Sequence, residues 1–221
     1  MIRVQYAKRI VELTGAEKGL ATGAYTRDRL KKQFMKSLST KPGYGDSFTM
    51  NIHDSTLIMM IGKYSEQFIF QPLEEIKQWM GFNSGLFYEP GYPDLYYSIK
   101  KRDGKISPNK SAISGVGEGM AGCIAQRLYN CKRMSRPNHD FPDIVMSSGP
   151  VVYMVEAKST SISEAAVKSE IDDELPRMTS FVASCADIDS REIVGLLVGT
   201  AVMKESQFLE CSCFITEVRI V

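Results

Sequence analysis

The stretch FPDIVMSSGPVVYMVEAKST (residues 141–160) contains two short apolar runs, 144–146 and 151–155. The four residues between them are two serines, a glycine and a proline, which favour a turn. Runs of this length suit strands better than helices. The stretch therefore predicts a β-hairpin with a four-residue loop at residues 147–150.

The flanking sequence predicts a sheet with helices around it. Ser161 and Glu164 form a capping box that opens a helix, and its apolar stripe continues in phase across Pro176, so a kink is expected there. The expected elements of this half are, in order, a helix at 115–129, a strand at 131–134, the hairpin, a helix from 164, and strands at 193–198 and 208–221. This order predicts an α/β fold with a central mixed β-sheet flanked by helices.

The first hundred residues have a weaker pattern. The expected elements are helices at 4–13, 28–38 and 73–80, strands at 55–61 and 67–70, and a hairpin at 95–106 that turns at Asp103 and Gly104. A polar stretch at 102–114 is the best domain boundary, although it could be a surface loop. We therefore expect an N-terminal helical and mixed accessory region at 1–108, used for recognition or dimerisation, and a core at 109–221.

The composition is that of a globular protein. Of 221 residues, 43% are hydrophobic and 24% are charged, which excludes a mainly disordered chain. The five cysteines are an odd number, which favours a reducing compartment. The longest apolar run, 193–203, is too short to span a bilayer, and residues 1–13 lack the uninterrupted apolar run of a secretory signal. We expect a soluble cytoplasmic protein with no membrane partner.

Charge is unevenly distributed along the chain. The formal net charge is +1, but residues 97–136 contain nine basic and two acidic residues. Such clustering is what a surface that follows a phosphate backbone needs, although a solvated basic face is the commoner explanation. Nucleic acid is therefore a candidate partner.

Other motif classes fit the chain less well. Only two histidines, His53 and His139, are present, which argues against a histidine-rich zinc site. Gly115, Gly117 and Gly119 lack the spacing of a nucleotide-binding loop, and we expect them to serve close helix packing.

Three charged residues lie on the arms of the hairpin. Glu156 and Lys158 share a face of their strand, because side chains alternate with a period of two. With a four-residue loop, Asp143 faces Met154 and is the diagonal neighbour of Glu156 at about 7–8 Å, close enough for both carboxylates to hold one ion. A structural salt bridge to Lys158 is the alternative, since charges in apolar strands are costly unless they are paired or bound to metal.

These residues resemble the signature of the PD-(D/E)xK nuclease superfamily. Pro142 and Asp143 are followed, after twelve residues, by Glu156, Ala157 and Lys158, and the order of elements over 109–221 matches that core. A second Pro-Asp at Pro93 precedes another Asp-x-Lys, at residues 103–105, but across a polar turn rather than on an apolar strand. The resemblance implies a restriction endonuclease-like core and a metal-dependent endonuclease acting on double-stranded or branched DNA.

The resemblance also implies roles for individual residues. Asp143, Glu156 and the carbonyl of Ala157 would bind Mg²⁺, which Mn²⁺ can replace, and Lys158 would orient or activate the attacking water. Glu118 resembles the acid that many members place on the first core helix, although its position on the helical wheel, away from the apolar face, argues mildly against this.

The residues that we expect to contact DNA have weaker support than the metal-binding residues. The candidates are Arg133, Arg136, His139, Ser159 and Lys168. A solvated lysine is the better explanation at 168, and plain helix capping explains Ser159 equally well. The predicted function is that of a type II restriction-like homodimer. A Holliday junction resolvase-like nuclease and a non-catalytic DNA-binding module are the alternatives.

Overall fold

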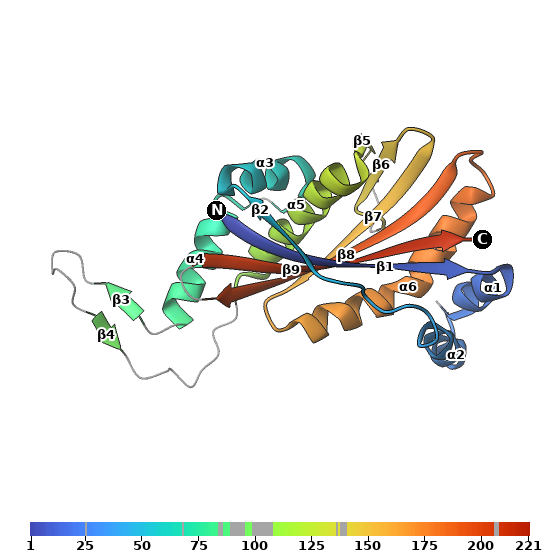
Figure 1. Ribbon diagram of the computed structural model, residues 1–221, viewed down its shortest axis with the longest axis horizontal. Coiled ribbons are helices and arrows are strands. Elements are labelled where there is room, and N and C mark those ends of the chain that lie inside the picture. Colours follow the sequence, from blue (N-terminus) through green and yellow to red (C-terminus); the bar gives the residue numbers. More distant parts are fainter. Residues whose placement is uncertain are drawn as a thin grey trace.

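The computed structural model describes the chain except residues 25, 68, 84–85, 89–95, 99–107, 136, 138–140 and 206–207. Its centre is a seven-stranded sheet in the order β2-β1-β9-β8-β7-β6-β5 (Figure 1). The strands are β1 (Ile2–Leu13), β2 (Phe48–Ile52), β5 (Lys132–Ser135), β6 (Ile144–Ser148), β7 (Val151–Thr160), β8 (Glu192–Glu205) and β9 (Phe208–Ile220). The β1–β9 and β7–β8 pairs are parallel and the other four pairs are antiparallel. The predicted α/β class with a mixed sheet flanked by helices is confirmed.

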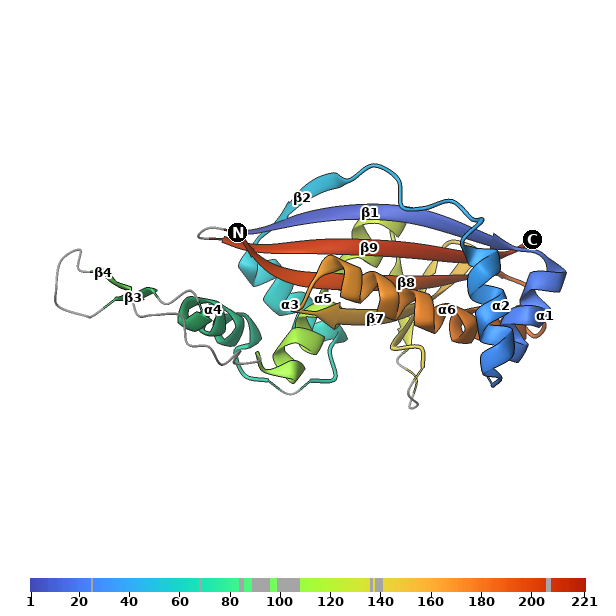
Figure 2. The same ribbon diagram turned by 90° about the horizontal axis from the view of Figure 1, so that it is seen from below.

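Helices cover both faces of the sheet (Figure 2). The helices are α1 (Gly15–Ala24), α2 (Asp28–Leu38), α3 (Asp54–Tyr64), α4 (Pro72–Asn83), α5 (Lys110–Tyr129) and α6 (Glu164–Ala186). Buried side chains of α3, α4 and α5 form one core with the sheet, and those of α1, α2 and α6 form a second core on the opposite face. Apolar packing thus holds β1, β2, β6, β7, β8 and β9, whereas the four residues of β5 are exposed. None of the described helices is long and apolar enough to cross a membrane.

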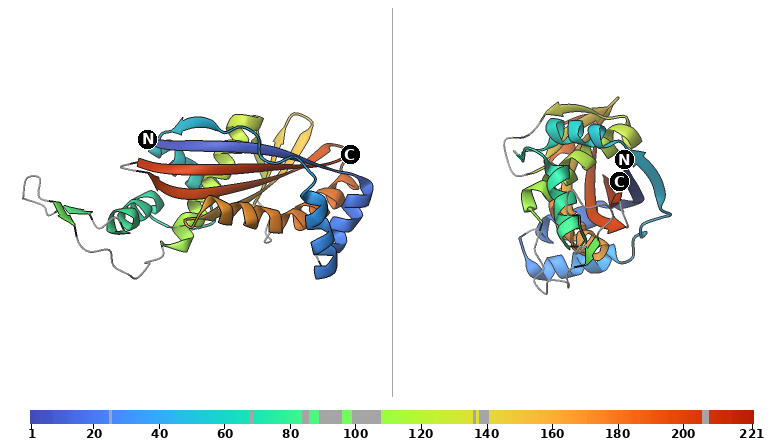
Figure 3. Two further views of the ribbon diagram at one scale, coloured as in Figure 1. Left: turned by 60° about the horizontal axis from the view of Figure 1, so that its bottom comes forward. Right: turned by 90° about the vertical axis from the view of Figure 1, so that its left-hand side faces the viewer.

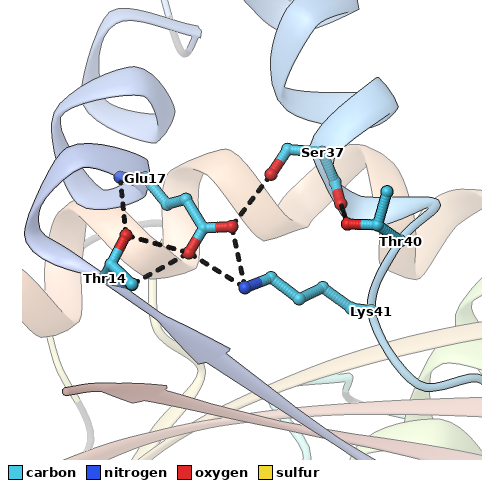
Figure 4. Close-up of polar contacts among 5 residues, drawn as sticks. All are labelled: Thr14, Glu17, Ser37, Thr40 and Lys41. Carbon is cyan, nitrogen blue, oxygen red and sulfur yellow. Dashed lines mark hydrogen bonds and ion pairs between the residues drawn. The ribbon is translucent and has the colours of Figure 1, made fainter.

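The N-terminal helices lie beside α6 (Figure 3). Glu17 closes a capping box with Thr14, whose backbone N–H donates to Glu17 Oε2 at 2.9 Å. The same carboxylate accepts from Ser37 Oγ at 2.9 Å and pairs with Lys41 Nζ at 2.7 Å, so it joins the start of α1 to the end of α2 (Figure 4). Salt bridges from Lys18 to Asp187 and from Lys31 to Asp173 connect this pair of helices with α6.

The glycines of α5 permit close packing, as predicted. A Cβ on Gly117 would lie 2.6 Å from the Cβ of Ser159 in β7, and one on Gly119 would lie 2.9 Å from the backbone nitrogen of Ile61 in α3. Real Cβ atoms do not approach this closely. Small residues therefore let α5 fit between the sheet and α3.

The prediction of a helix at 4–13 is wrong, because these residues belong to β1. Its buried residues include Ile2, Val4, Val11 and Leu13, and the strand lies between β2 and β9. Interspersed charges such as Lys8 resembled a helical pattern, but Lys8 is paired with the fully buried Glu217 of β9. Residues before 108 thus supply two strands to the sheet that we expected from 109–221 alone.

Two short strands were also predicted wrongly. Residues 55–61 lie in α3, which begins where the His53 ring accepts from the backbone N–H of Ser55, and 67–70 contain no strand in their described part. The buried residues Leu57, Met60, Ile61 and Tyr64 have helical spacing.

The remaining predictions differ mainly in their boundaries. Helices were correctly expected at 28–38, 73–80 and 115–129, the last of which begins five residues earlier. The cap of α6 is Ser163, whose Oγ accepts from Ala166, and not Ser161. Within the predicted hairpin at 95–106, β4 (Tyr96–Ser98) pairs with β3 (Leu86–Tyr88), and the expected turn at Asp103 and Gly104 lies outside the described residues.

Candidate functional site

The hairpin of β6 and β7 has a tighter turn than we expected. Ser148 lies opposite Val151, so Gly149 and Pro150 form a two-residue turn in which Gly149 has a φ of +57°. Glycine adopts this left-handed conformation without the steric cost that other residues bear. The register differs by two residues from that of a four-residue loop, so no side chain changes face. Asp143 and Glu156 therefore share a face as predicted.

The observed register places Asp143 directly across from Glu156 rather than diagonally. Ile144 pairs with Val155, and the next position outward joins these two acids. The backbone N–H of Asp143 donates to Glu156 Oε2 at 3.2 Å, and Asp143 Oδ2 accepts from the backbone N–H of Ala157 at 2.7 Å. Each carboxylate therefore contacts the backbone of the facing strand.

The backbone at Ala157 leaves an oxygen at the same place. Continuing the ladder outward, the residue opposite Ala157 is Pro142, which has no N–H to donate. The N–H and C=O of one strand residue point to the same side, so the Ala157 carbonyl is directed toward the Asp143 side of β7. Two carboxylates and one carbonyl thus lie close together.

Lys158 bridges the hairpin and α6. Its Nζ lies 2.9 Å from Glu156 Oε1 and 3.1 Å from Glu174 Oε1. Burial alone would lower the pKa of Lys158, but the two carboxylates outweigh it and raise that pKa, so the side chain is an ammonium at neutral pH. The side chain is 26% exposed, and solvent therefore reaches it.

Glu156 is the most enclosed group of this site, with a side chain only 4% exposed. Burial and, secondly, the charge of Asp143 raise the pKa of the Glu156 carboxyl, and Lys158 offsets only part of this. A cation shared by the two carboxylates would remove the repulsion between them.

The donor set suits a hard cation. Mg²⁺ prefers oxygen ligands, keeps several waters, and commonly takes one or two carboxylates from a protein. Across the described parts of the chain, no cluster of three or more His, Cys, Asp or Glu side chains is arranged to hold a metal ion. An ion at this hairpin would therefore use Asp143, Glu156, the Ala157 carbonyl and water, a set compatible with Mg²⁺.

The predicted acid Glu118 lies on α5, which packs against the sheet face opposite α6. Glu118 Oε2 accepts from the backbone N–H of Glu66 at 2.7 Å. This contact joins α5 to the connection between α3 and α4, and its place in the active site remains a prediction.

The three predicted DNA contacts that the structure describes, Arg133, Ser159 and Lys168, lie at separate places. Ser159 Oγ donates to the carbonyl of Ile113 on the α5 face, and the exposed Arg133 of β5 donates to the carbonyl of Lys63. Lys168 Nζ lies 4.1 Å from the centre of the Phe214 ring and 3.7 Å from Glu164 Oε2. Arg136 and His139 lie outside the described residues.

Sequence reasoning missed the contribution of α6. Glu170, Glu174 and Arg177 follow one another at helical spacing, alongside the apolar stripe that faces the sheet. Glu174 reaches Lys158, and the Arg177 guanidinium lies 4.3 Å from the centre of the Phe141 ring, two residues before Asp143. The polar stripe was visible in the sequence, but its orientation toward β7 was not.

No protein-family model and no curated protein matches the chain. The hairpin and α6 are therefore the parts of the molecule that point to a function.

Proposed function

We propose that this protein is a Mg²⁺-dependent endodeoxyribonuclease whose core resembles that of the PD-(D/E)xK nucleases. The observation that supports this most is the juxtaposition of Asp143 with Glu156, next to the backbone of Ala157 and with Lys158 on the same face. The carboxylate and carbonyl oxygens suit a divalent cation, and that cation together with the Lys158 ammonium would complement the negative charge of a phosphodiester. The specific form that we propose is a type II restriction-like enzyme acting as a homodimer.

The residues of the hairpin would have separate roles in catalysis. Asp143, Glu156 and the Ala157 carbonyl would hold the ion. When bound there, Mg²⁺ would act as a Lewis acid that neutralises charge on the phosphate and lowers the pKa of a bound water molecule. Lys158 orients the attacking water or a phosphate oxygen through its N–H donors. Glu174 is its second carboxylate partner and holds the ammonium in place from α6.

A non-catalytic DNA-binding module is the second candidate. One observation favours it: Lys158 is paired with both Glu156 and Glu174, which is also what a structural salt bridge at a sheet end looks like. The same contacts exist under either candidate, so DNA cleavage by the wild-type protein, and its loss in Lys158→Ala, is what separates the two.

Cleavage assays test the proposal directly. The purified protein is incubated with a long mixed-sequence duplex and with a four-way junction, in Mg²⁺, Mn²⁺ or EDTA. Discrete fragments of the duplex, formed with either metal and absent in EDTA, support the restriction-like enzyme. Cleavage of the junction alone indicates a resolvase-like nuclease, and DNA binding without any cleavage supports the module.

Matched variants connect the activity to the site. Asp143→Asn and Lys158→Ala are expected to abolish cleavage while keeping the wild-type fold. Lys18→Ala is the control, because it removes the same charge from an ion pair with Asp187 outside the hairpin. Cleavage that survives in both site variants would refute the assignment.

A further inference from the structure

Arg177 is a cation at the edge of the candidate site. It lies on α6, three residues after Glu174, and is half-buried. Its guanidinium rests 4.3 Å from the centre of the Phe141 ring, and Phe141 also packs edge-on against Phe181. Within the described residues, Arg177 makes no ion pair or hydrogen bond through its guanidinium. The side chain is thus held in place by an aromatic face while its N–H donors stay available.

A cavity of about 430 Å³ adjoins this guanidinium. Arg177 is the charged residue of its lining, which also contains the apolar side chains of Phe181 and Ile188. Ser184 Oγ donates to the carbonyl of Ser180, so that hydroxyl is already engaged. The cavity therefore combines one strong cation with an apolar lining.

A further cation beside the site would favour DNA binding. Among the described residues, the Lys158 ammonium is paired with Glu156 and Glu174, and Asp143 adds a third carboxylate beside Glu156. Bound Mg²⁺ would offset this negative charge, and without it a DNA strand that reached Asp143 would be repelled unless other cations lay nearby. Arg177 lies on the same side of the sheet, next to the segment that leads into Asp143. Its planar fork matches the oxygens of a phosphate, which it can bind with two parallel hydrogen bonds.

We propose that Arg177 and this cavity bind the DNA backbone at a nucleotide neighbouring the cleaved bond. The guanidinium holds the phosphate of that nucleotide, and Phe181 and Ile188 pack against its sugar. This inference rests on the proposed function for its substrate, but it concerns binding and can be tested without cleavage.

The test is the salt dependence of DNA binding. Fluorescence anisotropy with a labelled duplex measures affinity from low to moderate NaCl, in EDTA and again in Ca²⁺, for wild type, Arg177→Ala and Arg177→Lys. Each phosphate contact contributes about 0.9 to the slope of log K against log salt. Arg177→Ala is expected to reduce that slope by about 1 and to weaken binding roughly 10-fold at 0.1 M salt. Arg177→Lys should keep the slope and lose part of the affinity.

Arg191→Ala is the matched control, since Arg191 is an exposed arginine paired with Asp189. Thermal unfolding of each variant establishes that it is folded. An unchanged slope in Arg177→Ala, with wild type binding DNA, overturns this inference and leaves the nuclease proposal standing. If the slope is reduced in Arg177→Ala but the wild-type protein never cleaves DNA, the phosphate site stands and the nuclease proposal is rejected. A wild-type protein that does not bind DNA overturns both.

Discussion

Gly199 of β8 is the position at which the seating of α6 can be tested. It pairs with Lys158 on one side and with Phe214 on the other, directly under α6. A Cβ at this position would lie 2.8 Å from Val167 Cγ2 and closer still to Ile171 Cδ1. Carbon atoms prefer about 3.5–4.0 Å, so Gly199→Ala requires α6 to move outward by about 1 Å or its side chains to leave their rotamers.

The expected cost follows from two opposing effects. Overpacking of a core costs about 1–3 kcal/mol, and replacing a strand glycine by alanine returns about 0.4–1 kcal/mol through the unfolded chain. We expect a net destabilisation of about 1–2 kcal/mol, which lowers Tm by roughly 3–6 °C in a protein of this size. Because Glu174 lies three residues after Ile171, the same shift should weaken its contact with Lys158.

Urea unfolding followed by circular dichroism measures the effect. Gly19→Ala is the control, because Gly19 lies within α1 and an added Cβ would have no atom within 4 Å. This variant should gain up to about 1 kcal/mol in the free energy of unfolding. Ile171→Val removes the Cδ1 atom that collides, so the double variant should recover part of the loss. Strictly additive effects, or wild-type stability in Gly199→Ala, would refute the packing argument.

Three further predictions concern single groups. Glu174→Gln should slow DNA cleavage about 10- to 100-fold by removing a charged hydrogen bond from Lys158, whereas Asp173→Asn, which removes a carboxylate of the same helix that pairs with Lys31, should leave the cleavage rate near wild type; equal rates in the two variants would contradict the positioning role. The pKa of Glu17 is lowered from 4.5 to about 2, chiefly by its hydrogen bond from Lys41, so its contribution to stability is complete above about pH 4.5 and is lost as the pH falls toward 2. Glu17→Gln should therefore lose less stability than wild type between pH 4.5 and 2 in acid-unfolding curves, and parallel curves would show that this ion pair does not matter. Ser163→Ala should cost about 1 kcal/mol in urea unfolding, because Ser163 caps α6, and a matching loss in Ser161→Ala would restore the capping box that the sequence suggested.

The elements that the sequence predicted well are those governed by neighbours along the chain. The β6–β7 hairpin, α5, α6 and the strands β8 and β9 all have unmixed periodicity and clear turn or cap residues. Their errors lie at the ends: β8 extends seven residues beyond its predicted end, α5 begins five residues early, and two serines compete for the cap of α6. β1 was predicted wrongly because its charged residues broke the alternation of a strand, and its principal partner β9 lies some 200 residues away.

The candidate site also has features that the local sequence predicted and features that depend on the packing of distant elements. Glu156 and Lys158 share a face because side chains alternate along a strand. Asp143 lies on the same face because the turn contains an even number of residues. Both are local properties of residues 141–160. The direct pairing of Asp143 with Glu156, the second carboxylate on Lys158 from Glu174, and the place of Arg177 over Phe141 all depend on how closely elements pack. Residues distant in sequence meet only when the elements that bear them pack closely. The lack of a side chain at Gly199 lets α6 lie close to β8, and sequence periodicity carries no information about the distance between a helix and a sheet.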